Sequence, residues 1–459
     1  MVKNHCKTNP DFINNWCQLY RDHNQIDPQS YTDFHVKRGL RNPDGTGVVA
    51  GLTLIGNVHG YLLNEGERMP VEGKLTYRGI DVEEIVASCE AENRFGFEEV
   101  AFLLLFGCLP TQSQLTEFIN LLGELRELPD GFTEDMIIKA PSQDIMNKLA
   151  QATLTLYSYD ETPDGTGLEN VLRQCIELIA RFPTIVAHAY QAKKRYFDKQ
   201  SMYIHFPKEH LSTAENFLRT IRPDKKYSEA EAKLLDLSLV LHAEHGGGNN
   251  SAFASRVLSS SGTDTYSAIA AAIGSLKGPK HGGANCKVVA MFEDIKEHLR
   301  DWTDETEIAA YLEKILTKEA GDGSGLIYGM GHAIYTLSDP RAVLLKKKAR
   351  QLAEVKHMTA EFQLIEAVER LTPGVMAKLK GDARAICANV DLYSGFVYQM
   401  LNIPPELYTA IFAVARIVGW SAHRVEEVVN GGKIIRPAYK SIVPASKYVS
   451  ISQRESGQI

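Results

Sequence analysis

The sequence predicts an all-α fold class with one short β segment near the N-terminus. Three observations support this prediction. Helix start and stop signals with helical apolar spacing recur through most of the chain. Strand-like sequence is confined to residues 48–63 and 74–79, and glycine clusters at 246–248, 282–283, 321–331 and 431–432 separate the predicted helices. Separately, the length of 459 residues favours two or three domains over one core.

The first 45 residues are polar and mixed in character, and we expect them to form an N-terminal arm. The run Asn-Pro-Asp-Gly-Thr-Gly at 42–47 is a dense turn signal that closes this arm. The two strand-like stretches follow directly. The arm is therefore expected to lead into the β segment.

Several helices can be placed from their ends. Residues 97–106 are apolar and run into Gly107, as in a buried helix with a glycine terminus. Ser228 and Glu231 form a capping box that opens the next helix. Residues 265–276 are rich in alanine, so other elements can pack closely against them.

Three further helices lie in the second half of the chain. One is expected from Gly283 to about His298. The pair Asp339-Pro340 indicates an N-cap followed by proline at the first helical position. The last helix is predicted to open at residues 404–406 and to run to about Trp420.

Composition indicates a soluble protein. Hydrophobic content of 44% and charged content of 23% are ordinary for a globular enzyme. The net charge of −7 argues against nucleic acid or membrane surfaces as partners, and an anionic ligand would need local arginines. No apolar run approaches a membrane span and no signal peptide is recognised, so a cytoplasmic location is expected. The seven dispersed cysteines indicate reduced thiols rather than a disulfide framework: Cys6, Cys17, Cys89, Cys108, Cys175, Cys286 and Cys387.

His281 stands among glycines in residues 278–285, just before a predicted helix. Glycines leave room for a substrate to approach the ring. The positive end of the helix disfavours imidazolium, and a neutral imidazole can donate to a carbonyl oxygen that becomes an enolate. The alternative is a loop histidine that caps this helix.

His332 lies in a second glycine-rich stretch, nine residues before Arg341. Such a pair could polarise a ketone while the arginine binds an adjacent carboxylate. The alternative is a surface turn followed by a charged helix start.

Asp391 precedes an apolar run, where burial next to a helix would shape its basicity as a general base requires. An ordinary N-cap aspartate is the alternative. Arg416 falls inside the apolar run 410–418, so its charge must be paired, extended to the surface or bound to an anion. Arg436 follows near the C-terminus.

His242 and His245 lie on one side of a predicted helix, which raises the possibility of a metal site. The H-E-x-x-H pattern is absent and no cysteine pair completes a ligand set, so no metal is predicted. A zinc protein stays open as a minor alternative. A simpler role for His245 is to face a polar ligand.

Taken together, these residues resemble the citrate synthase family. The resemblance runs from about Gly51 to Ser441, and four blocks carry it: 241–249, 278–285, 329–341 and 389–395. It implies a large helical domain made of residues 46–287 and 401–459. It also implies a smaller helical domain, 288–400, that closes over the substrates and excludes water.

The resemblance also implies the activity, the condensation of acetyl-CoA with oxaloacetate to citrate. Asp391 and His281 would enolise the thioester, and His332 would polarise the ketone. The residues implied to bind oxaloacetate are His245, Arg341, Arg416 and, from the partner subunit of a homodimer, Arg436. Coenzyme A would enter as a thioester substrate, with no cofactor bound permanently.

Three positions depart from patterns common in the family. Ala333 replaces a frequent arginine and Thr336 a frequent lysine, both near the expected coenzyme A site. Lys280 is a candidate substitute for these phosphate contacts. Cys286 stands where a carboxylate or amide is common, and is interpreted as a packed thiol.

Two further interpretations compete with citrate synthase. A 2-methylcitrate synthase, which uses propionyl-CoA, would share every catalytic residue, because one methylene gives only modest discrimination. A non-catalytic helical scaffold is the alternative from another class. All of the proposed catalytic positions nevertheless hold competent residue types.

Overall fold

The computed structural model describes residues 10–65, 67–381 and 385–454. Two parts of the predictions, the start of the arm with Cys6 and the end of the large domain at 455–459, lie outside these residues. The described part is mostly helical, as predicted, with one small antiparallel sheet in the order β1-β2-β3. The strands are β1 (Gly56–Asn64), β2 (Glu67–Tyr77) and β3 (Ile80–Asp81).

The helices fill the remainder of the fold. The α-helices are α1 (Pro10–His23), α2 (Pro28–Asp33), α3 (Val82–Ala91), α4 (Phe97–Phe106), α5 (Gln112–Leu125), α6 (Ile145–Leu156), α7 (Leu168–Tyr196), α8 (Thr213–Ile221), α9 (Glu229–His242), α10 (Asn250–Ser260), α11 (Thr265–Lys277), α12 (Ala284–His298), α13 (Glu305–Leu316), α14 (Pro340–Val355), α15 (Thr359–Lys380), α16 (Asp391–Met400) and α17 (Tyr408–Asn430). Short helical turns are η1 (Arg38–Leu40), η2 (Thr133–Ile138), η3 (Tyr157–Tyr159), η4 (Pro405–Leu407) and η5 (Ile451–Gln453).

Most of the predicted helix ends are confirmed. Gly107 caps α4 in the left-handed conformation, with φ of 81°. The Ser228 capping box opens α9, and Asp339 with Pro340 opens α14. The chain carries these signals in adjacent residues, which explains why sequence alone located them.

Two boundaries differ from the prediction. The last helix begins with the turn η4 and continues as α17 to Asn430, ten residues beyond Trp420. Its extra turns pack against other helices, and packing was not visible in the sequence. The β segment is displaced as well: residues 48–55 are not a strand, whereas 67–73 belong to β2, despite the turn-like Pro70. Pro70 opposes Tyr61 of β1 in a register that the hairpin imposes.

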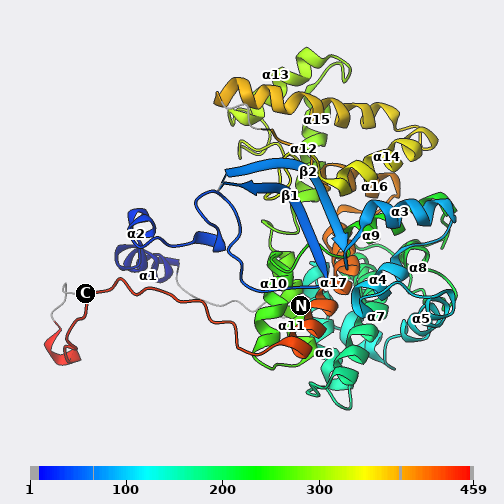
Figure 1. Ribbon diagram of the computed structural model, residues 1–459, viewed down its shortest axis with the longest axis horizontal. Coiled ribbons are helices and arrows are strands. Elements are labelled where there is room, and N and C mark those ends of the chain that lie inside the picture. The colour runs from blue at the N-terminus through cyan, green and yellow to red at the C-terminus, as the bar shows by residue number, and fades with distance from the viewer. Residues whose placement is uncertain (1–9, 66, 382–384, 455–459) are drawn as a thin grey trace.

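Figure 1 shows how these elements surround α17. This helix packs against α4, α7, α9, α10 and α11, and buries Trp420 completely. A second group, α12 to α16, gathers above it, and the β1-β2 hairpin crosses between the two groups (Figure 1). The polar α1 and α2 and the extended C-terminal segment lie away from the helical body (Figure 1). The end of α9, the start of α14 and α17 meet where the hairpin crosses, and this is where the predicted site residues gather.

Candidate active site

Arg416 lies at the centre of the site. Its side chain projects from the middle of α17 and the residue is 1% exposed. Nε donates to the carbonyl oxygen of His242 at 2.5 Å, while Nη1 and Nη2 have no hydrogen-bond partner in the described part of the chain. Burial lowers the pKa of the guanidinium to about 10, with Glu244 opposing the shift. A buried cation with two unpaired amino groups is suited to bind an anion.

His245, His332 and Tyr335 form a group of rings next to Arg341, and the charges of both Arg341 and Arg416 act on His245. The rings of His245 and His332 meet edge to face with centroids 5.2 Å apart, and Tyr335 stacks on His332 at 4.7 Å. Nε2 of His245 is buried and has no partner among the described residues. Burial lowers the pKa of His245 well below its usual range, and the positive charge of Arg341 contributes to the shift. A neutral ring with an unused polar atom fits the predicted polar-ligand role of His245.

The backbone selects the tautomer of His332. Its Nδ1 accepts the backbone N–H of Ile334 at 3.2 Å and of Tyr335 at 3.1 Å. Nδ1 therefore carries no proton, and in the neutral ring the proton must sit on Nε2. Burial lowers the pKa of His332 to about 4, and the positive charge of Arg341 contributes to the shift. Its ring is thus a neutral Nε2–H donor near pH 7, and it is half-buried rather than on the surface turn of the alternative interpretation.

Arg341 is held in place by Asp339. Arg341 Nε lies 3.0 Å from Oδ1 of the carboxylate and Nη2 lies 2.7 Å from Oδ2, and both residues are buried. Oδ1 also accepts the backbone N–H of Arg341 as the cap of α14. This fork-to-fork pairing fixes the guanidinium and leaves Nη1 as its remaining amino group. The sequence indicated Asp339 only as a helix cap, so its pairing with Arg341 was missed.

The hairpin braces the loop that follows His332. A Cβ on Gly60 would lie 2.8 Å from the carbonyl oxygen of Ile334, and one on Gly73 would lie 2.1 Å from that of Ser338. Arg68 also donates to the Ile334 carbonyl at 3.1 Å. Only glycine allows the strands so close to the loop. The hairpin therefore holds the backbone that selects the His332 tautomer.

His281 bonds to a buried hydroxyl. Its Nε2 lies 3.0 Å from Oγ of Ser251, and the same oxygen accepts the indole N–H of Trp420 at 3.1 Å. No hydrogen bond of the ring to α12 is present in the described chain, so the helix-cap alternative is wrong. Burial lowers the pKa of His281 to about 4, and the positive charge of Arg416 contributes to the shift. When Ser251 donates to Nε2, the neutral ring presents its proton on Nδ1.

Asp391 is the first residue of α16, but it is not the cap of that helix. Val390 occupies the cap position, and the described residues make no hydrogen bond to the Asp391 carboxylate. Burial raises the pKa of this carboxyl to about 6, although Arg341 and Arg416 oppose the shift. A carboxylate that water and donors stabilise poorly is a stronger base.

Other predicted residues lie elsewhere. Arg436 is exposed in the segment after α17, and Lys280 is exposed next to His281. The ring of His242 stacks on Phe412 at 4.3 Å, and its nitrogens have no partner in the part of the chain the structure describes. Within that part, no three histidine, cysteine or acidic side chains are grouped to hold a metal ion. None of its helices is long and apolar enough to cross a membrane.

Sequence reasoning also missed residues that support the site. Ser251, Tyr335 and Asn389 are brought in by the fold, and Asn389 positions α16 by accepting the backbone N–H of Asp391 at 3.0 Å. The charge of Arg41 also reaches His332 and lowers its pKa. Ser251 lies in the first turn of α10, whereas Tyr335 and Asn389 lie in loops, and their contacts with the site depend on the fold, so their position in the chain gave no usable signal.

The fold is predominantly helical, and its candidate site brings two buried guanidinium groups together with neutral histidines and a buried carboxyl group. A sequence model of the family described as "Citrate synthase, C-terminal domain" matches residues 44–438. The citrate synthase of Haloferax volcanii is 34% identical over 370 residues, covering 80% of this chain and 88% of that one. The 2-methylcitrate synthase 1 of Corynebacterium glutamicum is 33% identical and covers 92% of this chain and 100% of its own length.

Solved structures agree. Citrate synthase from Thermotoga maritima superimposes with a TM-score of 0.72 at 31% identity, covering 92% of this chain and all of that one. A ternary complex of carboxymethyl coenzyme A and oxaloacetate with the Thermoplasma acidophilum citrate synthase gives 0.73 at 28% identity, with coverage of 91% and 99%. The chain belongs to the citrate synthase family, a family of acyltransferases.

Proposed function

We propose that the protein condenses acetyl-CoA with oxaloacetate and water to give citrate and coenzyme A. The observation that carries this proposal is the pair of buried arginines, Arg341 and Arg416, beside a neutral His332 whose free proton is on Nε2. Two guanidinium groups match a dicarboxylate, and an N–H donor in the same site matches its ketone. The Thermoplasma acidophilum relative was solved with oxaloacetate and a coenzyme A derivative, which supports the same substrates here.

The chemistry divides between two groups of residues. Asp391 takes a proton from the acetyl methyl group while His281 donates a hydrogen bond to the thioester oxygen, giving an enol or enolate. The enol carbon attacks the oxaloacetate ketone, and His332 gives its Nε2 proton to the oxygen that develops charge. His332 regains a proton, by way of solvent, from the Asp391 carboxyl, so that both groups return to their starting states. Water then cleaves the citryl thioester to release citrate and coenzyme A. The thioester is thus a substrate, and the proposal requires no permanently bound cofactor.

The two neutral histidines suit this division. A pKa of about 4 keeps both rings uncharged near pH 7, so each acts as a hydrogen-bond donor rather than as a cation. The raised pKa of Asp391, about 6, brings the base closer to the pH at which it works. Residues 288–400 would move as the smaller domain and residues 46–287 with 401–459 as the larger one, closing over these groups.

A paired assay tests the reaction and its substrate. Thiol release is measured with oxaloacetate and either acetyl-CoA or propionyl-CoA, using wild type and His281→Ala. We expect acetyl-CoA to have the higher kcat/KM, and His281→Ala to lose activity with both. A clearly higher kcat/KM for propionyl-CoA would make the protein a 2-methylcitrate synthase, the name that several relatives carry. Equal, slow release by wild type and the variant would favour the non-catalytic scaffold.

We also infer a homodimer in which Arg436 completes the partner's site. Arg436 has no hydrogen bond or ion pair within the described chain, and its extended segment exposes Tyr439 (93%) and Tyr448 (85%). Such apolar exposure is suited to an interface. Lys280, exposed beside His281, is the candidate for a coenzyme A phosphate contact.

Subunit mixing tests the shared site. Arg416→Leu and Arg436→Leu chains are each expected to be nearly inactive alone. If Arg436 acts across the dimer, co-expression restores about a quarter of wild-type activity, because half the dimers are mixed and each holds one intact site. No restoration, with mixed dimers present on native mass spectrometry, would place Arg436 in its own subunit's site or in none.

A further inference from the structure

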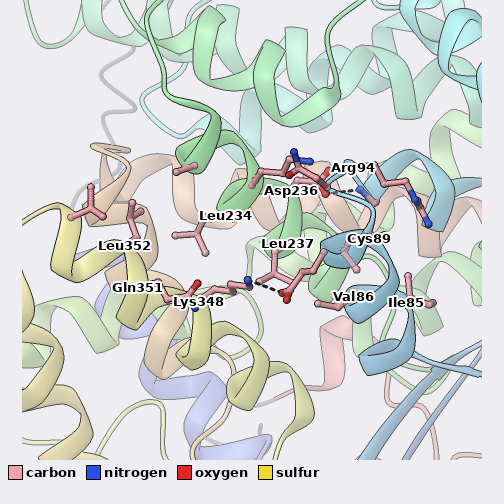
Figure 2. A pocket seen from close by; sticks show the side chains of 17 residues that line it. Ile85, Val86, Cys89, Arg94, Leu234, Asp236, Leu237, Lys348, Gln351 and Leu352 are labelled. Carbon is pink, nitrogen blue, oxygen red and sulfur yellow. Dashed lines mark hydrogen bonds and ion pairs between the residues drawn. The ribbon is translucent and has the colours of Figure 1, made fainter.

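A cavity of about 320 Å³ lies between α3, α9 and α14, apart from the site residues. Figure 2 shows α14 facing α3 across it, with Lys348 extended toward the opposite helix. Lys348 pairs with Glu90 of α3 at 3.1 Å. A volume of this size is at the lower end of the range for small-molecule sites. The cavity therefore has room for a small ligand.

Its walls are mostly apolar. The side chains that line it include Val86, Leu234, Leu237, Val240 and Leu352. Leu237 and Leu352 are labelled in Figure 2, on the facing helices α9 and α14. Apolar walls favour an aliphatic body, since each methylene moved from water contributes to binding.

The polar groups leave one cation without an anion. Among the described residues, Lys233 makes no ion pair, and its ammonium lies 4.3 Å from the centroid of the Phe95 ring. Arg94 is paired with Glu92 and Glu99.

The neighbouring acid, Asp236, neutralises Lys233 poorly. Asp236 accepts the backbone N–H groups of Gly96 and Phe97 at 2.7 and 3.2 Å. Burial raises the pKa of its carboxyl, the charge of Glu98 adds to the shift, and no ion pair joins it to Lys233 among the described residues. The lysine therefore gives the cavity a positive group that can receive a carboxylate.

The cavity is connected to the site by two helices. Arg341 is in the first turn of α14, and Lys348 follows seven residues later, about 10 Å along the axis. The wall residue Val240 precedes His242, whose carbonyl oxygen accepts from Arg416. A ligand that contacts both helices is placed to shift the two arginines relative to each other.

We propose that this cavity binds a medium-chain aliphatic monocarboxylate, with the carboxylate on Lys233 and the chain between α9 and α14, and that binding changes the affinity for the keto acid. The second half of this statement rests on the proposed function, whereas the binding itself does not.

Calorimetric titration of the full-length protein with butanoate, hexanoate and octanoate tests the binding. Affinity is expected to rise about fourfold per methylene. Lys233→Met keeps an aliphatic side chain and removes the charge, so octanoate should bind about tenfold more weakly while 1-octanol is unaffected. Lys347→Met is the matched control, because Lys347 is an exposed lysine of α14 outside the cavity lining. Gln351→Trp, at an exposed lining position, should obstruct the cavity and weaken both ligands.

Several results would overturn the proposal. No saturable heat with octanoate would exclude the site, and equal weakening by Lys233→Met and Lys347→Met would show a non-specific charge effect. Unchanged binding by a folded Gln351→Trp protein would place the ligand elsewhere. The coupling is measured as the change in KM for oxaloacetate at saturating octanoate, which Gln351→Trp should abolish. Binding without a change in KM overturns the coupling alone, and an enzyme inactive on oxaloacetate and acetyl-CoA refutes the proposed function while the calorimetry still decides the site.

Discussion

The two halves of the candidate site are built in opposite ways. In the keto-acid half, proposed to comprise His245, His332, Arg341 and Arg416, contacts fix two of the groups. Asp339 holds Arg341, two backbone N–H groups orient His332, and the hairpin packs against the loop between them. In the thioester half, His281 bonds to one hydroxyl, and the described chain offers the Asp391 carboxylate no hydrogen bond. Under the proposed function, rigid geometry would serve recognition in the first half, and poor solvation would serve reactivity in the second.

The largest expected effect is in the thioester half. Asp391→Asn should lower kcat about 10³-fold, because a positioned general base contributes on that order. Oxaloacetate binding, measured by calorimetry, should change little because the keto-acid half is intact. A variant that kept its kcat would show that another group removes the proton. A variant that lost oxaloacetate binding would show that the two halves do not act independently.

A substitution in the keto-acid half should instead weaken the binding of oxaloacetate. Arg416→Leu removes a buried cation that would pair with a carboxylate, so oxaloacetate should bind about 100-fold more weakly. His281→Ala is the matched control and should bind oxaloacetate as wild type does. If both variants bound oxaloacetate equally well, the arginine would have no role in recognition.

The pH profile sharpens the comparison. Asp391 must be ionised to act as a base, and its pKa is raised to about 6, so kcat/KM should fall about tenfold per pH unit below that value. The pKa of His281 and that of His332 are lowered to about 4, so both rings stay neutral as Asp391 becomes protonated around pH 6. If kcat/KM fell only below about pH 4, the pKa of Asp391 would not be raised, and its carboxylate would not be poorly solvated.

The bracing of the keto-acid half can be tested at a glycine. Gly73→Ala would place a Cβ 2.1 Å from the carbonyl oxygen of Ser338 and must shift the loop, so KM for oxaloacetate should rise several-fold, about 5–10-fold by analogy with small positioning errors. Gly47→Ala, where no atom lies within 4 Å of the added Cβ, is the control. Equal KM values in both variants would mean that the hairpin does not set the loop.

The smallest effect concerns stability. The folded state raises the pKa of Asp391 from 3.8 to about 6, so the ionised carboxylate costs stability as pH rises through this window. Asp391→Asn should therefore raise Tm by about 1–2 °C at pH 8 relative to wild type, with the gain shrinking below pH 4. Differential scanning calorimetry at both pH values measures this gain, and one that did not depend on pH would not arise from the carboxylate.

Much of the fold and the candidate site could be predicted because their signals are local. Capping pairs such as Asp339-Pro340 lie next to each other in the chain, and the four blocks that carry the family resemblance, three of which contain histidine, are short. Other features depend on distant residues. The final turns of α17 form against neighbouring helices, and β2 is completed by pairing with β1.

By itself, the sequence determined which residue types were present: the two glycine-flanked histidines, Asp391, and an arginine inside an apolar helix. Only the tertiary structure decided what state each would be in. Burial beside Arg416 makes His281 neutral, two N–H groups place the His332 proton on Nε2, and desolvation raises the pKa of Asp391. The physical reason is that protonation depends on solvent access and on charges brought close by folding, and residues far apart in the chain supply both.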